Sequence, residues 1–110
     1  MLKISFALLG DGRVVRVDAS GHAESAAYGE DLVCAAASVL LQSLWLGLTH
    51  VVGITVDGGW TSGDLRMSIT DADAERIDVA ALMQTALRSL EALAHEHPKN
   101  VRVTVQRPVA

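Results

Sequence analysis

The chain has 110 residues, half of them apolar and 20% charged, which is the composition of one globular domain and excludes a disordered tail. Its formal net charge of −4, from 13 acidic and 9 basic residues, argues against a protein that binds nucleic acid through a broad basic face. The single cysteine, Cys34, excludes an intrachain disulfide and a paired-cysteine metal or redox site. We therefore expect a single cytoplasmic domain over residues 1–110.

The first half of the chain predicts a hairpin, a loop and a long helix. Residues 2–9 and 13–20 are short apolar runs typical of strands, and Gly10-Asp11-Gly12 between them favours a tight turn. The small residues of 21–29, bounded by glycines, predict a loop. Residues 30–49 are strong helix formers and apolar on nearly all sides, which predicts a central helix buried on more than one face. Within it, polar residues interrupt the apolar run from Leu32 to Leu48, which falls short of the ~20 apolar residues that a bilayer needs, so we expect no membrane span.

The second half predicts two more strands, a helix and a final strand. A strand is expected at about 50–56, then a turn at Asp57-Gly58-Gly59, then an alternating strand that ends at Thr70. Apolar residues at helical spacing predict a second helix that runs from Asp71 or Asp73 until Pro98 stops it. Alternating valines predict a last strand from Val101 to Gln106. The order β-β-α-β-β-α-β indicates an α+β fold with two helices and a largely antiparallel sheet.

Cys34 is the residue best suited to chemistry. It lies five residues past Gly29 and three past Asp31, so we expect it in the first turn of the helix. At that position, the backbone N–H groups and the helix dipole would stabilise a thiolate. The N–H groups could also donate hydrogen bonds to an oxyanion. The spacing permits His22 to fold back onto the thiol as its base without showing that it does. A free cysteine is also one of the most buried residue types, so on these residues alone an inert core role stays open.

The segment around Cys34 carries a recognisable pattern. Its residues are Gly21-His22-Ala23, Gly29, Asp31, Val33-Cys34-Ala35-Ala36 and Ser38. Together they resemble the Prp family of ribosomal-processing cysteine proteases. The resemblance implies a small dimeric enzyme that removes a short N-terminal extension from ribosomal protein number 27 of the large subunit. It also implies Cys34 as the nucleophile and His22 as the general base and then acid, and we expect no metal or other cofactor.

Four further residues of the pattern have supporting roles that the sequence leaves open. Asp31 is expected to cap the helix, with orientation of His22 as the alternative, because a carboxylate near the thiol would oppose its ionisation. Ser38 either lines the site or bonds back to the carbonyl of Cys34, one turn earlier. Gly21 and Gly29 are expected to be hinges of a lid over the peptide, turn residues, or both at once.

The remaining polar motifs predict structure rather than chemistry. His95-Glu96-His97 has i, i+2 spacing, which points its imidazoles to different sides of a helix, so we interpret it as a helix C-terminus. Asp57-Gly58-Gly59 and Gly63-Asp64 lack the lysine of a phosphate loop and are expected to be turns. His50 opens the expected strand without an identifiable partner. Trp45 and Trp60 are expected to be core or interface anchors.

Three classes of function are compatible with the sequence. A processing protease and a thiol hydrolase acting on another acyl substrate both need the Cys34 thiolate. A catalytically silent dimeric module that binds a ribosomal protein would tolerate Cys34→Ala with its binding intact. Cleavage of a peptide, cleavage of a small ester and binding without cleavage therefore distinguish the three.

Overall fold

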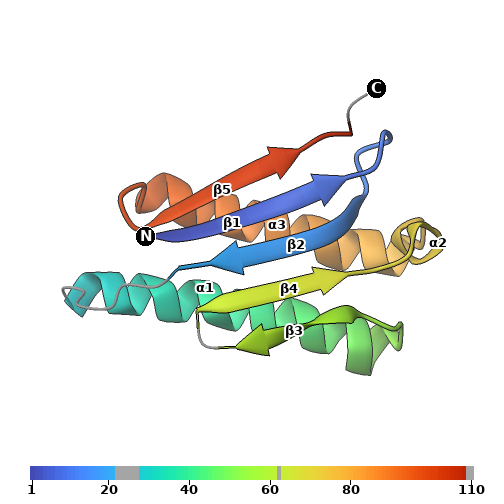
Figure 1. The fold of residues 1–110 in the computed structure, drawn as a ribbon, viewed down its shortest axis with the longest axis horizontal. Helices are drawn as coiled ribbons and strands as arrows, with labels where there is room; N and C mark the ends of the chain where they lie inside the picture. Colours follow the sequence, from blue (N-terminus) through green and yellow to red (C-terminus); the bar gives the residue numbers. More distant parts are fainter. Residues whose placement is uncertain (22–27, 62, 109–110) are drawn as a thin grey trace.

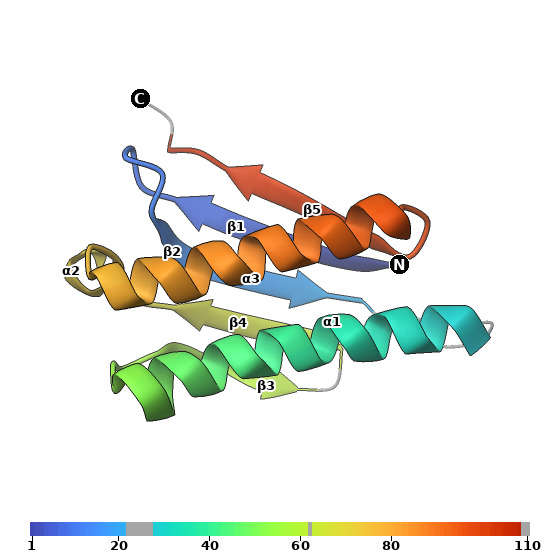
Figure 2. The same ribbon diagram turned by 180° about the vertical axis from the view of Figure 1, so that it is seen from behind.

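The computed structural model describes residues 1–21, 28–61 and 63–108, apart from the side chains of 28–31. In these residues one five-stranded sheet carries the two long helices on a single face (Figure 1, Figure 2). The elements are, in chain order, β1 (Leu2–Leu8), β2 (Val14–Ser20), α1 (Tyr28–Leu46), η1 (Gly47–Val52), β3 (Asp57–Thr61), β4 (Asp64–Ser68), α2 (Asp71–Ala74), α3 (Ile77–Glu96) and β5 (Val101–Gln106). The predicted α+β fold and its order of strands and helices are confirmed.

The strands lie in the order β3-β4-β2-β1-β5, and the pairs are antiparallel except for the parallel pair of β1 with β5. In β1 the apolar side chains of Leu2, Ile4 and Phe6 are buried, and the residues between them lie on the other face. Phe6 is paired with Val17 of β2, which is also fully buried. Because side chains alternate along a strand, this register directs the apolar residues of neighbouring strands to the helices.

The core lies between the sheet and the two long helices, α1 and α3, which pack against each other as well. The largest fully buried side chains are Phe6, Ile4, Leu48, Met67, Met83, Leu90, Val14, Val17, Val79 and Val101. The first helix was expected to be buried on more than one face, but it packs along one side only and leaves Leu32, Val39 and Leu46 exposed. Because η1 (Gly47–Val52) extends the helical backbone, the stretch Leu32–Val52 is longer than the apolar run expected from the sequence. By length and composition alone it could cross a membrane, but in this structure it covers the sheet.

The strand expected at 50–56 is wrong. Helical backbone continues past α1 as the π-helix η1, and it ends where Gly53 takes a left-handed conformation with φ of 83°. Leu48 is fully buried and holds η1 against the core, so tertiary packing overrides the strand preference of the β-branched residues that follow. The strand instead begins at Asp57, within the segment expected to be a turn.

The glycines of that segment serve strand pairing. A Cβ atom on Gly58, which has φ of 134°, would collide with the backbone carbonyl oxygen of Arg66 in β4. A Cβ atom on Gly59 would meet none of the described residues within 4 Å. Gly58 is therefore required by the close approach of β3 to β4, a requirement that has no local signature in the sequence.

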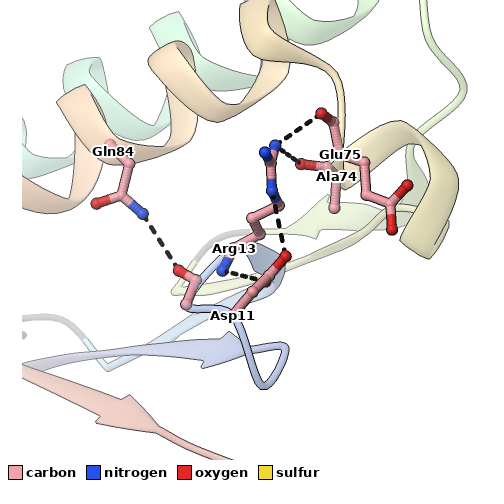
Figure 3. Close-up of polar contacts among 6 residues, drawn as sticks. Asp11, Arg13, Ala74, Glu75 and Gln84 are labelled. Atoms are coloured by element: carbon pink, nitrogen blue, oxygen red, sulfur yellow. Dashed lines mark hydrogen bonds and ion pairs between the residues drawn. The ribbon is translucent and has the colours of Figure 1, made fainter.

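Arg13 joins the β1–β2 hairpin to the corner between α2 and α3, as Figure 3 shows. Its Nη1 donates hydrogen bonds to the carbonyl oxygens of Ala74 at 3.2 Å and Glu75 at 2.7 Å. Gln84 of α3 donates to the carbonyl oxygen of Gly12 at 3.4 Å. The last carbonyl groups of a helix lack partners within it, so the guanidinium satisfies the end of α2 and fixes the hairpin beside it.

Candidate active site

Cys34 is the seventh residue of α1 and therefore lies in its second turn. The expectation of a first-turn position is wrong, because the helix begins at Tyr28, two residues before the expected start. Only the first four N–H groups of an α-helix lack a partner within it, so the Cys34 N–H is not a free oxyanion donor. The effect of the helix dipole also falls off within the first turn. The groups that influence the thiol therefore belong to the elements packed around α1 and not to the helix N-terminus.

The Cys34 side chain is half-buried and lines a cavity of about 80 Å³. The cavity lies between α1 and the ends of four strands. Its lining residues are Leu2, Ala19, Gly21, Cys34, Ser38, Leu41, Trp60, Gly63, Asp64 and Leu65. The cysteine is therefore neither sealed in the core nor fully exposed, and a group that enters the cavity can reach its sulfur.

Gly21 connects the end of β2 to this cavity. Its φ is 95°, and a Cβ atom there would collide with the backbone carbonyl oxygen of Met1. The Gly21 N–H donates to the carbonyl oxygen of Gly63 at 3.0 Å, which ties the end of β2 to the β3–β4 connection. Gly21 therefore has a conformation that only glycine adopts without strain, as expected of a turn residue. Its role as a hinge stays a prediction.

The rest of the predicted pattern is only partly described. His22 and the 23–27 part of the expected loop lie outside the described residues. Gly29 lies inside the first turn of α1 and not in a loop, so the helix takes in the end of the expected loop. Asp31 is the fourth residue of α1, so the prediction that it is the N-cap residue is wrong. Its side chain is not described, and orientation of His22 stays a prediction.

Ser38 lies one turn after Cys34 on the same side of α1 and lines the cavity beside it. Thr49 and Thr85, one in η1 and one in α3, donate from their hydroxyl groups to the carbonyl oxygen four residues earlier, at 2.8 and 2.7 Å. Among the hydrogen bonds of the described residues, Ser38 makes no such bond to Cys34. Of the two predicted roles, the structure therefore favours a hydroxyl that lines the site.

Two cavity residues were not singled out as site residues from the sequence. Trp60 at the end of β3 is 39% exposed and forms an aromatic wall, whereas it was expected to be a core or interface anchor. Asp64 at the start of β4 brings a carboxylate to the cavity, and its Oδ2 lies 3.7 Å from Nη2 of Arg66. Gly63 lies in a turn as predicted, whereas Asp64 is the first residue of β4, and only the pairing of β3 with β4 places it beside Cys34.

The other predicted positions lie away from the cavity. His95 is exposed in the last turn of α3, and His97 follows as its C-cap residue, as the helix C-terminus interpretation expects. His50 is exposed on η1. Trp45 is half-buried and packs against the core. Within the described ranges, no three His, Cys, Asp or Glu side chains gather as metal ligands would.

The geometry suits an accessible thiol beside an apolar wall. Leu2, Leu41 and Leu65 offer surface for an apolar side chain, and Asp64 offers a carboxylate for a cationic group. A thiol at such a position can attack an acyl carbon that is held against the wall.

Comparisons with known proteins place this arrangement in a family. The sequence model of the cysteine protease Prp family matches residues 1–102. The ribosomal processing cysteine protease Prp of Staphylococcus aureus is 27% identical over 106 residues, which cover 94% of this chain and 97% of that protein.

Solved structures share the fold over nearly the whole chain. One is an essential ribosomal processing protease Prp from Staphylococcus aureus in complex with a covalently linked product peptide. It has a TM-score of 0.85 and 25% identity, with 96% of this chain and 100% of that chain covered. A protein from Streptococcus mutans has a TM-score of 0.88 and 26% identity, with 98% and 96% covered.

Proposed function

This chain belongs to the cysteine protease Prp family, and from that premise we propose that it removes the short N-terminal extension from ribosomal protein number 27 of the large subunit. In this proposal Cys34 is the nucleophile, and His22 is the general base and then the general acid. The observation that carries the proposal is that Cys34 and Gly21, the residue before His22 in the chain, line one cavity. The covalently linked product peptide of the Staphylococcus aureus relative supports a covalent intermediate.

The proposed reaction is acyl transfer in two steps. His22 accepts the proton of the Cys34 thiol, the thiolate attacks the scissile carbonyl carbon, and His22 then donates the proton to the leaving amine as the C–N bond breaks. Water then attacks the thioester with His22 accepting its proton, which releases the peptide acid and restores the thiol. In this reaction Ser38 and Trp60 line the cavity that takes the peptide, and no metal or cofactor supplies a step.

The proposal includes a homodimer that forms through α1. Leu32, Val39 and Leu46 are 54%, 60% and 53% exposed, and they recur at seven-residue spacing along one side of the helix. No Asp, Glu, Lys or Arg occurs from Leu32 to Val56. An antiparallel pair of α1 helices would set Val39 against its own copy and Leu32 against Leu46, which is the self-complementarity that a two-fold interface requires.

Peptide cleavage tests the catalytic assignment. The substrate is a peptide that carries the extension of the host ribosomal protein, and mass spectrometry of the products locates the cut. We expect Cys34→Ser and His22→Ala each to abolish cleavage, because the two side chains act as a unit. His50→Ala is the matched control, since this exposed histidine lies on η1 and away from the cavity.

The alternatives give different results in the same assay. A folded His22→Ala variant with full activity would remove the histidine from the mechanism. Cleavage of a small thiol-reactive ester without cleavage of the peptide would favour another thiol hydrolase. Binding of the ribosomal protein by the native chain and by Cys34→Ala, with no cleavage by either, would favour a silent binding module. A host ribosomal protein without an extension would remove the proposed substrate.

The dimer has its own test. Val39→Glu places a charge at the proposed two-fold axis and is expected to give a monomer in sedimentation at micromolar concentration. Ile77→Glu is the matched control, because Ile77 is 86% exposed at the start of α3, outside the α1 stripe. A native chain that sediments as a monomer, or a Val39→Glu variant that stays dimeric, would contradict this interface.

A cytoplasmic location belongs to the same proposal, because ribosomal proteins are processed where ribosomes assemble.

A further inference from the structure

The outer edge of β5 borders a groove that the proposed function does not use. Among the described strands, β5 has a neighbour on one side only, and it lies at the opposite edge of the sheet from β3 (Figure 1). Between β5 and α3 lie two hollows of about 470 and 300 Å³, and Glu91 of α3 lines both. Val103 and Val105 contribute apolar surface to the hollows, and Val105 is 37% exposed. The groove therefore has an apolar floor beside an open strand edge.

The charge of the groove opposes that of the chain. Arg88, Arg102 and Arg107 line the two hollows, together with His95. Of the described residues that line the hollows, Glu91 alone has a carboxylate, and Arg88 already pairs with it at 3.3 Å. A basic groove on a chain with a net charge of −4 is a local reversal that favours an acidic ligand.

We propose that this groove binds an extended acidic segment of a partner protein, which pairs with β5 as an additional strand. An edge strand offers unpaired N–H and C=O groups in a fixed register, which an extended peptide can match. Side chains alternate along such a peptide, so one set faces Val103 and Val105 and the arginines meet carboxylates on either side. This surface goes beyond the proposed protease function and does not depend on it.

Two other occupants fit the groove less well. A second copy paired through β5 would bring Arg102 and Arg107 close to the same residues of its partner, and like charges at an interface are costly. Single-stranded nucleic acid is usually held by stacking its bases on aromatic side chains. Among the residues that the structure describes, no Phe, Tyr or Trp lines the two hollows.

Fluorescence anisotropy with defined probes tests the proposal on the full chain. The main probe is a labelled peptide of alternating glutamate and valine. Its controls are the same peptide with alternate backbone nitrogens methylated, the lysine–valine analogue, and a short oligouridylate. We expect binding of the glutamate peptide alone, with slowed amide hydrogen exchange over residues 101–107 in its complex.

Variants connect the binding to the groove. The pair Arg88→Gln with Arg107→Gln is expected to raise the Kd of the glutamate peptide about tenfold at low ionic strength, since each exposed charge pair contributes a modest share. Arg16→Gln with Arg76→Gln removes the same charge elsewhere on the surface and is expected to leave the Kd within about twofold. Equal binding of the methylated peptide would overturn strand addition. Three results would each overturn the proposal: tighter binding of oligouridylate than of the glutamate peptide, an equal rise in Kd for both double variants, or no binding of the glutamate peptide.

Discussion

Replacing Gly58 by alanine is expected to destabilise the protein and disturb the cavity, whereas the same change at Gly59 is not. The two glycines are neighbours in β3, and all five residues of that strand are exposed. Only Gly58 has a positive φ, at 134°, and only there would a Cβ atom collide with the backbone of Arg66. The pair therefore separates a backbone requirement of one position from the general preference of strands for larger residues.

The size of the effect follows from the cheapest way to relieve the clash. The carbonyl of Arg66 belongs to β4 and cannot move without disturbing Leu65 and Met67, which are 3% and 1% exposed. β3 is an edge strand, so it moves instead and loses pairing around Gly58. A net loss of about 1 kcal/mol per hydrogen bond over about two bonds, with at least about 1 kcal/mol of strain, gives roughly 3 kcal/mol.

Thermal unfolding followed by circular dichroism measures this difference. A loss of roughly 3 kcal/mol lowers Tm by about 12 °C in a domain of this size. Gly59→Ala is expected to leave Tm within about 2 °C, because its Cβ enters open space and alanine reduces the freedom of the unfolded chain. Because Trp60 lies two residues beyond Gly58 and lines the cavity, Gly58→Ala is also expected to lower kcat/KM for the peptide. Equal Tm values for the two variants would refute the reasoning.

Three further results are expected. Iodoacetamide should label Cys34 in the folded protein, because its side chain is half-buried at a cavity; labelling that appears only after denaturation would indicate an inert core thiol. Arg13→Met should lower the free energy of unfolding by about 2 kcal/mol, because its two hydrogen bonds to carbonyl groups are lost. Arg16 forms an exposed ion pair with Asp18, so Arg16→Met should change the free energy of unfolding by less than about 0.5 kcal/mol. Equal effects of the two substitutions in denaturant melts would contradict the Arg13 contacts. A hydrogen bond from Arg76 lowers the pKa of Asp78. The pair therefore stabilises the fold at pH values above the ordinary pKa of a carboxyl group, and this stabilisation is lost as pH falls through the lowered pKa. Asp78→Asn should make Tm less sensitive to acid, and an unchanged dependence of Tm on pH would argue against the pairing.

The sequence determined the fold class because its patterns are local. Alternation in residues 2–9, 13–20 and 101–106 and helical spacing up to Pro98 require no knowledge of what packs where. The three strands and the α+β class are confirmed. The helix expected from Asp71 or Asp73 is instead divided into α2 and α3, because the backbone of Arg76 between them is extended. The motif around Cys34 likewise indicated the family from residues within positions 21–38, which the family match over residues 1–102 confirms. The roles of His22 and Asp31 in the chemistry, and the dimer, stay predictions.

The tertiary structure decided the features that depend on distant neighbours. Residues 50–56 have the composition of a strand, but the burial of Leu48 against the core keeps the backbone helical as far as Val52. Asp57-Gly58-Gly59 has the composition of a turn, but the close approach of β4 makes it a strand.

The cavity follows the same rule. Residues from four strands, β1 to β4, from α1 and from the β3–β4 connection meet at Cys34, although they are far apart in the chain. Sequence spacing placed the thiol near a helix start, but Trp60 and Asp64 reach it only because β3 and β4 pair beside α1. Local preferences act over a few residues, whereas a site is assembled by pairing and packing between elements, and only the folded chain specifies those contacts.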